Sequence, residues 1–355
     1  CVSLVQKRYN FTFSGCAVFL QHLQLWISGE AQRRLELLHT TVFSLAFSPC
    51  GKYLAAGNNY GQVGIFSLSA ALSIEATEEN KKPIFTFQAH EGPVYSLLST
   101  NRQLMSSGSG EVKSWNWNDV IKKGCREVWC RRPAFGTLLE IPEINSLVLN
   151  QKDNSLLMAC GDNTIHSMDL ENGTFTRTMK GHTDYVHCLS LREMHNECIS
   201  GSEDGSVRIW DLRTATQVQV IEPHKYEECS RPQFGKWIGC LTTDSDWMVC
   251  GGGPALTLWH LRSVTPTTIY RLQGCQHQAM FYQDLILAAG EGGAISHCQL
   301  SGEVKTQVPC TPPVVYSLLV NNHSMEHKVL TAAGSSSSID IFTNFGYRAF
   351  SLRFS

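Results

Sequence analysis

The stretch that decides the fold reads GH at residues 181–182, SGSEDG at 200–205 and WD at 210–211. Apolar and polar residues alternate on both sides of Asp204-Gly205, which is typical of two antiparallel strands joined by a tight turn. The run VHCLSL at residues 186–191 has the composition of another strand. The stretch therefore predicts a small sheet built from strands that follow one another along the chain.

The same pattern occurs seven times, at intervals of 39 to 53 residues. In each copy a glycine lies seven to nine residues before the residue that closes the next strand, and Val, Ile or Leu stands three positions before that closing residue. The seven pairs are Gly57/Phe66, Gly108/Trp115, Gly161/Met168, Gly201/Trp210, Gly251/Trp259, Gly290/Cys298 and Gly334/Phe342. Four short strands fit each interval, and one such sheet cannot bury both of its faces alone. We therefore predict an all-β, seven-bladed β-propeller over residues 35–355, with residues 1–34 outside it.

The end of the chain bears on how this ring closes. Phe350, Leu352 and Phe354 alternate with polar residues directly after a turn at residues 344–346. Such alternation is typical of a strand. We expect this C-terminal strand to complete the seventh blade, and the alternative is an N-terminal strand that interlocks with the last blade.

Composition excludes several classes of protein. Charged residues make up 17% of the 355 residues, against roughly 25% in an average soluble domain. The net charge is −2, whereas a chain whose main task is to grip phosphates is more basic. The nearest approach to a membrane span or a secretory signal, residues 16–27, falls short of the ~18 apolar residues that a span requires. We therefore expect no membrane partner.

The cysteines indicate the redox compartment. The chain has 14 of them and no CxxC motif, and the closest useful spacing is that of Cys125 and Cys130. Most of the others lie in apolar, strand-like runs, where cysteine acts as a small hydrophobic residue. A reducing compartment, the cytosol or the nucleus, is expected.

Candidate sites for chemistry are weak. The GGGP at residues 251–254 resembles a phosphate cradle in composition only, because it lies between two predicted strands and not at the start of a helix. Asp244 and Asp246 form a close pair of carboxylates, for which we expect a solvated turn. His and Cys never occur at zinc-ligand spacing. We predict a protein that is not an enzyme and has no catalytic residues, cofactor, metal or small-molecule substrate.

Two irregular stretches are better candidates, as surfaces for a partner. The long connection at residues 116–140 mixes basic and aromatic side chains, which suits a protein partner or stacking on RNA and is also compatible with a plain solvated loop. The stretch at residues 222–236 carries charges of both signs, which favours a protein partner. The candidate partner surface comprises Trp117, Lys122, Lys123, Arg126, Trp129, Arg131, Arg132, Tyr226 and Arg231.

The segment from residue 181 to residue 211 resembles a complete WD repeat. In that family a His, a strand Ser, a turn Asp and a Trp are hydrogen-bonded across one blade, which here implies a network of His182, Ser200, Asp204 and Trp210. Its role is structural, since it satisfies buried polar groups. The second repeat keeps His90 and Trp115 but has Gly110 where the turn Asp is expected.

The chain also resembles the THO complex subunit 6 family. The resemblance rests on residues 55–61, 81–90, 181–189, 245–262 and 342–352. It implies a non-catalytic scaffold subunit of the nuclear THO/TREX complex, which supports its assembly and couples mRNA transcription and processing to nuclear export. The implied partners are other THO subunits, in particular the coiled-coil subunits 5 and 7, with mRNA reached mainly through the complex. The implied location is the nucleus, in nuclear speckles, with some protein in the cytoplasm.

Two alternative functions remain open, a propeller that binds RNA directly and a receptor for a ubiquitin ligase. Trp210, Asp211 and Arg213 fit the W-D-x-R pattern by which some propellers dock as substrate receptors onto cullin–RING ubiquitin ligases. An Arg after Trp-Asp-Leu is also ordinary in this repeat, so the motif is weak.

Overall fold

The computed structural model describes residues 30–135 and 141–354. The chain divides into two compact units between His39 and Thr40. Helix α2 (Glu30–Leu38) belongs to the first unit. It runs across the domain boundary predicted after residue 34, so the division lies a few residues later than the repeat pattern indicated. The signal-like run at residues 16–27 lies outside the described residues.

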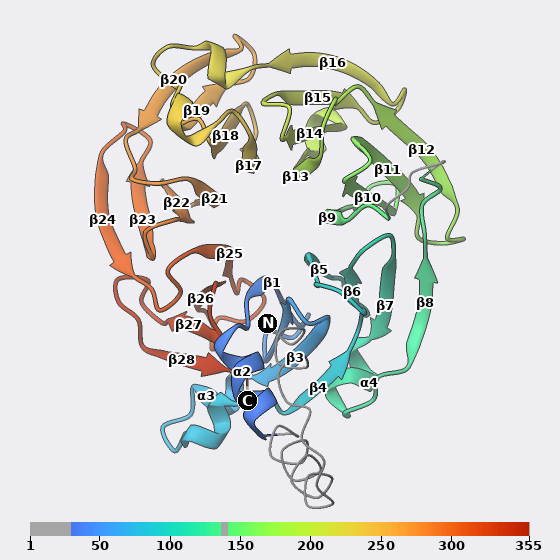
Figure 1. Ribbon diagram of the computed structural model, residues 1–355, viewed down its shortest axis with the longest axis vertical. Helices are drawn as coiled ribbons and strands as arrows, with labels where there is room; N and C mark the ends of the chain where they lie inside the picture. The colour runs from blue at the N-terminus through green and yellow to red at the C-terminus, as the bar shows by residue number, and fades with distance from the viewer. Residues whose placement is uncertain (1–29, 136–140, 355) are drawn as a thin grey trace, which may run out of the picture. The chain divides into compact units, whose positions relative to one another are not determined.

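The second unit is a ring of seven four-stranded antiparallel sheets (Figure 1). The first three sheets are β1 (Val42–Phe47), β2 (Tyr53–Asn58), β3 (Gln62–Ser67) and β4 (Phe85–Gln88); β5 (Ser96–Ser99), β6 (Gln103–Ser107), β7 (Val112–Asn116) and β8 (Glu127–Arg131); and β9 (Ile144–Asn150), β10 (Ser155–Cys160), β11 (Thr164–Asp169) and β12 (Phe175–Lys180).

The remaining four sheets repeat this order. They are β13 (Val186–Arg192), β14 (Glu197–Ser202), β15 (Val207–Asp211) and β16 (Thr216–Ile221); β17 (Ile238–Asp244), β18 (Trp247–Gly252), β19 (Leu256–His260) and β20 (Thr265–Tyr270); β21 (Gln276–Tyr282), β22 (Leu285–Gly290), β23 (Ala294–Gln299) and β24 (Val304–Pro309); and β25 (Val315–Val320), β26 (Leu330–Gly334), β27 (Ser338–Phe342) and β28 (Phe350–Arg353). The predicted seven-bladed propeller is confirmed.

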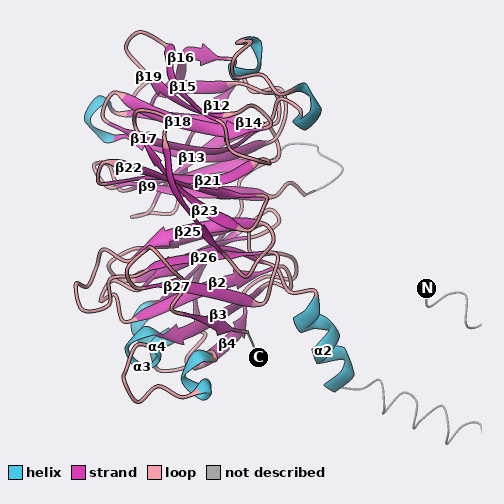
Figure 2. Cartoon of the chain, turned by 90° about the vertical axis from the view of Figure 1, so that its left-hand side faces the viewer, coloured by secondary structure: helices cyan, strands magenta, loops and turns pink. Residues whose placement is uncertain are grey.

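Short helices interrupt the connections between strands. They are α3 (Leu68–Ala71), η2 (Glu78–Lys81), α4 (Trp117–Ile121), η3 (Glu193–His195), η4 (Pro223–Lys225) and η5 (Pro232–Phe234). Figure 2 shows the sheets from the side, with the loops at the two rims of the ring. No described helix is long and apolar enough to cross a membrane.

The ring closes through the seventh blade itself. Strand β28 pairs with β27, with Leu352 opposite Ile339, and the innermost strands β1 and β25 of the first and last blades contact each other. Phe354 then packs edge-on against Phe66 of β3, with the ring centroids 5.7 Å apart. The expected C-terminal fourth strand is thus confirmed, and the interlocking N-terminal strand is not what fills that place.

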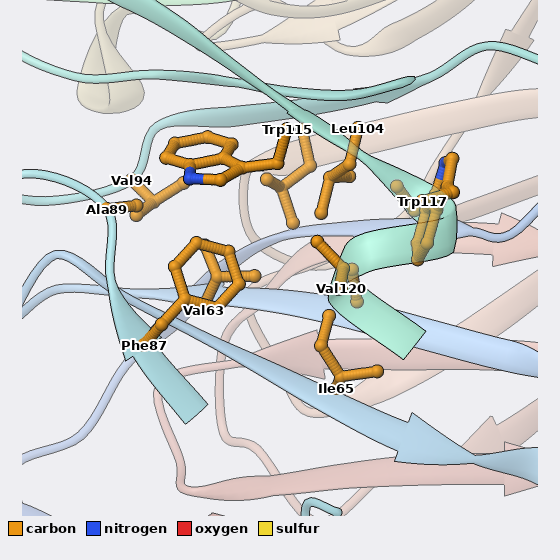
Figure 3. Packing of buried hydrophobic residues seen from close by; sticks show 12 residues of the cluster. Val63, Ile65, Phe87, Ala89, Val94, Leu104, Trp115, Trp117 and Val120 are labelled. Carbon is orange, nitrogen blue, oxygen red and sulfur yellow. The ribbon is translucent and has the colours of Figure 1, made fainter. Parts of the chain in front are cut away.

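The core lies between neighbouring sheets. Between the first two blades, Val63, Ile65 and Phe87 of the first face Leu104 and Trp115 of the second (Figure 3). Burying one such apolar side chain contributes roughly 2 kcal/mol. Since every blade has a neighbour on each side, stacking in a closed ring buries the faces that a single sheet would leave exposed.

The cysteines behave as the sequence indicated. All those among the described residues are free, and Cys160, Cys198, Cys240, Cys250 and Cys298 are buried. Cys188 is half-buried in strand β13. Burial raises the pKa of its thiol to about 12, which keeps it protonated and unreactive.

Candidate functional site

The fourth blade contains a continuous chain of hydrogen bonds that runs from Asp204 through His182 and Ser200 to Trp210. The imidazole of His182 lies between two partners, with Nδ1 2.8 Å from Oδ2 of Asp204 and Nε2 2.7 Å from Oγ of Ser200. The indole Nε1–H of Trp210 donates to the same Ser200 oxygen over 2.9 Å. The network therefore joins His182, in the connection before β13, to Ser200 on β14, Trp210 on β15 and Asp204 in the turn between those two strands.

Burial determines the protonation of this network and its access to solvent. Burial lowers the pKa of His182 despite the neighbouring carboxylate. For Asp204 burial works the other way, but hydrogen bonds from His182 and Ser206 outweigh it and hold the pKa of the carboxyl well below its usual range. A neutral imidazole then donates from Nδ1–H to the carboxylate and accepts the Ser200 hydroxyl at Nε2. Ser200 is fully buried, so the Ser-His-Asp geometry fixes a turn and offers no nucleophile to a substrate.

The second blade repeats the network with a different acid. His90 Nε2 lies 2.7 Å from Oγ of Ser106, and Nδ1 lies 3.2 Å from Oε1 of Glu111. Burial opposes ionisation of Glu111, but hydrogen bonds from Arg132, Lys113 and His90 hold its pKa at about 2. Glu111 thus replaces the turn Asp. The sequence signal for it was an acidic residue one position after Gly110.

Trp117 does not belong to a partner surface. It begins helix α4, is 3% exposed, and donates its indole N–H to Oγ of Ser99 over 3.0 Å. Figure 3 shows it beside Val120 in the cluster between the first two blades. The candidate surface is corrected here, because the predicted loop at 116–140 includes this helix and strand β8, the outermost strand of the second blade (Figure 1).

The other candidate partner residues between 116 and 140 are either exposed or half-buried. Lys122, Lys123, Arg126 and Arg132 are exposed, while Trp129 and Arg131 on β8 are half-buried. Trp129 packs against the core cluster between the second and third blades. The guanidinium of Arg132 lies 2.7 Å from the Glu111 carboxylate. Four basic side chains thus remain accessible at this edge.

Arg231 has an internal role that the sequence did not reveal. Its guanidinium donates hydrogen bonds of 2.9 to 3.3 Å to backbone carbonyls on the fifth blade and the connection after it, namely those of Gly252, Gly253, Pro254, Leu272 and Gly274. Tyr226 packs its ring edge-on against Trp259, with the centroids 5.0 Å apart. The guanidinium of Arg231 is therefore occupied within the fold, whereas Tyr226 is half-exposed beside Trp259 and stays a predicted partner residue.

The two weak chemical candidates are also structural. The GGGP run ends strand β18 and turns into β19, as expected. Asp246 differs from the expected solvated turn, because its carboxylate lies 3.0 Å from Arg192 and 2.7 Å from Arg262. The ion pair with Arg192 connects the fourth and fifth blades at this turn, whereas the pair with Arg262 lies within the fifth blade.

One cluster in the third blade has the groups of a metal site. The thiol of Cys160, the carboxylate of Asp162 and the imidazole of His166 lie within 4.8 Å of one another. The His166 Nε2 atom is already 2.9 Å from Asp162 and 2.8 Å from the hydroxyl of Thr164. These three residues are the candidate metal ligands among the described residues. The hydrogen bonds of His166 with Asp162 and Thr164 resemble those that His182 forms with Asp204 in the fourth blade.

The W-D-x-R residues lie at the end of strand β15. Trp210 is buried in the network above, whereas the Arg213 side chain is 76% exposed. Its guanidinium lies 3.2 Å from the carboxylate of Asp211. Only the charged end of the motif is therefore accessible.

Comparison with known proteins now identifies the family. The model described as "WD domain, G-beta repeat" matches residues 33–67 and 81–116, and the one described as "Nucleolar protein 10-like, N-terminal domain" matches residues 136–273. The chain is 63% identical over 327 residues to THO complex subunit 6 of Homo sapiens, covering 92% of this chain and 96% of the human protein. The chain belongs to the THO complex subunit 6 family.

Other members of the THO complex subunit 6 family match along most of their length. The homolog of Danio rerio is 59% identical over 90% of this chain and 99% of its own length. The subunit of Drosophila melanogaster is 30% identical over 89% of this chain and 90% of its own length. The resemblance seen in the sequence is confirmed, and it extends over nearly the whole ring.

Proposed function

We propose that this chain is a non-catalytic scaffold subunit of the nuclear THO/TREX complex, which supports assembly of the complex and couples mRNA transcription and processing to nuclear export. The single observation that carries the proposal is the identity of 63% over 96% of the human THO complex subunit 6. The match covers 92% of this chain and 96% of the human protein, so it is not explained by one shared repeat.

The geometry supports a docking role. The polar clusters described above form hydrogen bonds within the fold and hold turns and blades together. Examples are His182 with Ser200 and Arg231 with five backbone carbonyls. What the ring offers to partners is a rigid surface, and rigid surfaces lose little entropy on binding. The proposed partners are other THO subunits, in particular subunits 5 and 7. With a net charge of −2, the chain reaches mRNA mainly through the complex, in nuclear speckles and to some extent in the cytoplasm.

Affinity purification tests this proposal. The full-length chain is captured from nuclear extract at moderate salt, and the eluate is analysed by mass spectrometry. Stoichiometric THO subunits are the expected result. A cullin–RING adaptor without THO subunits would overturn the scaffold role.

A second candidate, a substrate receptor of a cullin–RING ligase, is favoured by one observation, the exposure of Arg213. The substitution Arg213→Ala separates the two functions. We expect it to leave the recovery of THO subunits unchanged. Loss of a ligase adaptor from the eluate of this variant would show a second role.

A further inference from the structure

The innermost strands carry a β-bulge at one repeated position. In β1, β9, β13, β17, β21 and β25 the register shifts one residue after the strand begins. The residues at the shift are Phe43, Asn145, His187, Gly239, His277 and Tyr316. In the second blade Tyr95 takes the equivalent place directly before β5, where its N–H bonds the carbonyl of Ser107. A bulge re-aims a side chain. The inner strands that carry this one surround the axis of the ring (Figure 1).

Rings at these positions touch one another from blade to blade. The centroids of Tyr95 and Phe43 are 6.2 Å apart, those of Phe43 and Tyr316 5.4 Å, and those of Tyr316 and His277 5.1 Å. Trp237 then stacks on His277 at 5.4 Å with an interplanar angle of 24°. These five rings, contributed by five of the seven blades and each half-buried, are called the axial belt below.

A glycine makes room for the tryptophan. The fifth blade has Gly239 at the bulge, and a Cβ there would lie 2.3 Å from the indole of Trp237. The indole therefore takes the place of the missing side chain. The Trp237 ring thus fills the place of a side chain at Gly239 and keeps the row of rings continuous in the fifth blade.

Carboxylates accompany the belt. Glu203 and Glu291 occupy equivalent positions, since their N–H groups bond the carbonyls of Tyr185 and Cys275 just before the inner strands. Glu143 directly precedes β9 and forms a bridge with Ser109. Burial and the charge of Glu291 together raise the pKa of Tyr316, and burial and the charge of Glu143 raise the pKa of Tyr95.

The charges around the belt are unbalanced toward negative. Glu203 pairs with His187 at 2.9 Å. Among the ion pairs of the described residues, neither Glu143 nor Glu291 has a cationic partner. The charge of Glu291 acts on His277, a ring of the belt, and on Arg231, whose donors are already taken up by backbone carbonyls.

We propose that the axial belt and its carboxylates bind an extended, arginine-containing segment of a protein partner. Aromatic faces attract a guanidinium, and carboxylates accept its paired N–H groups. The same carboxylates repel phosphate, so charge complementarity selects a basic peptide and disfavours nucleic acid. This surface is distinct from the basic edge at Lys122, Lys123 and Arg126, and the inference holds whichever complex the chain joins.

Fluorescence anisotropy tests the proposal with the full-length chain. The probe is a fluorescein-labelled decapeptide of glycine and serine with three arginines, compared with a twin in which citrulline replaces each arginine. Citrulline keeps the shape of the side chain and removes its charge. We expect binding of the arginine peptide and binding at least about tenfold weaker for the citrulline twin. Equal binding of the two peptides, or preferential binding of a uridine decanucleotide, would overturn the proposal.

Variants locate the binding. The pair Glu143→Gln and Glu291→Gln removes the charges in nearly isosteric form, and Tyr316→Leu removes one ring. Each variant is expected to weaken arginine-peptide binding about tenfold or more without lowering the melting temperature by more than about 5 °C. The matched controls are Glu326→Gln and Tyr347→Leu, at exposed positions of the seventh blade, which also carries Tyr316. If Tyr316→Leu proves unstable, the glutamine pair alone decides. Unchanged binding in that pair, or an equal loss in the controls, contradicts the proposal.

Discussion

At the scale of single residues, many polar side chains of this propeller form hydrogen bonds within the fold. Ser200 shows this clearly, since its hydroxyl is shared by His182 and Trp210 and is fully buried. Each group in such a network leaves a partner unsatisfied when it is removed, and an unsatisfied buried polar group costs more than the hydrogen bond contributed. We therefore expect substitutions in these networks to lower the free energy of unfolding.

Asp204→Ala tests the network in the fourth blade. The substitution removes the acceptor at 2.8 Å from the buried imidazole Nδ1 of His182 and leaves only the longer contact of 3.3 Å with Oγ of Ser206. We expect the free energy of unfolding to fall by about 2–3 kcal/mol, measured by urea denaturation. The control Glu171→Ala removes an exposed carboxylate and should change it by less than about 0.5 kcal/mol. Equal effects of the two substitutions would show that the network carries no stability.

Arg231→Lys tests the bonds between the guanidinium and the five carbonyls. Lysine keeps the charge but lacks the planar fork of donors, so we expect a loss of roughly 2–3 kcal/mol in the free energy of unfolding. The same change at the exposed Arg126 should be neutral. If Arg231→Lys is neutral as well and instead weakens partner binding, the sequence-based assignment of this residue to a docking surface was right after all.

The sequence predicts these residues unequally. His182 and Asp204 were found because the repeat places them at fixed offsets within one blade. Arg231 was misread because its acceptors lie 21 to 43 residues away and are backbone atoms, which leave no mark in the side-chain pattern. Glu111 was missed because it stands one position away from the repeat's usual acid.

At the scale of elements, outer strands are harder to predict than inner ones. Strand β8 has no fully buried residue, so the alternation that marks a strand is absent from its sequence. Strands β16 and β24 each have a single buried residue, Ile221 and Val308, so they too lack a regular alternation of buried and exposed positions. Residues 116–140 were read as a loop for this reason, although α4 and β8 fill half of the described part of this stretch.

The exposed basic edge at α4 and β8 remains a candidate docking surface. The triple variant Lys122→Glu, Lys123→Glu and Arg126→Glu should lower the recovery of THO subunits several-fold, because reversed rim charges slow association with a complementary surface. Its melting temperature should stay within about 2 °C of the parent, since these side chains are exposed. Recovery is measured by affinity purification with quantitative mass spectrometry.

A matched variant controls for net charge. Lys180→Glu, Arg271→Glu and Lys305→Glu reverse three exposed charges on other blades. Recovery of THO subunits should be unaffected by this second triple change. Equal losses in both variants, or no loss in the first, would remove the basic edge from the list of docking surfaces.

At the scale of the whole molecule, closure of the ring depends on the chain's last strand. Leu352 of β28 is fully buried, and Phe354 is 6% exposed beside Phe66. The seven-fold repeat predicted the number of blades because each blade is one continuous piece of sequence.

Two truncations test this account of closure. Deleting residues 350–355 removes β28 and two buried side chains, which should lower the melting temperature by about 10 °C or more. Deleting residues 1–34 should change the melting temperature of the propeller by less than about 2 °C, because β28 already supplies the fourth strand of the last blade. Circular dichroism measures both. An equally large loss in the N-terminal truncation would favour the interlocking N-terminal strand.

The central claim is that the intact ring is a docking subunit for its THO partners, and reconstitution from purified proteins tests it most directly. The full-length chain is mixed with purified THO subunits 5 and 7, and the mass of the product is measured by size-exclusion chromatography with light scattering. The account predicts co-elution in one complex whose mass includes this chain. Separate elution of a folded propeller and of the other two subunits would contradict it.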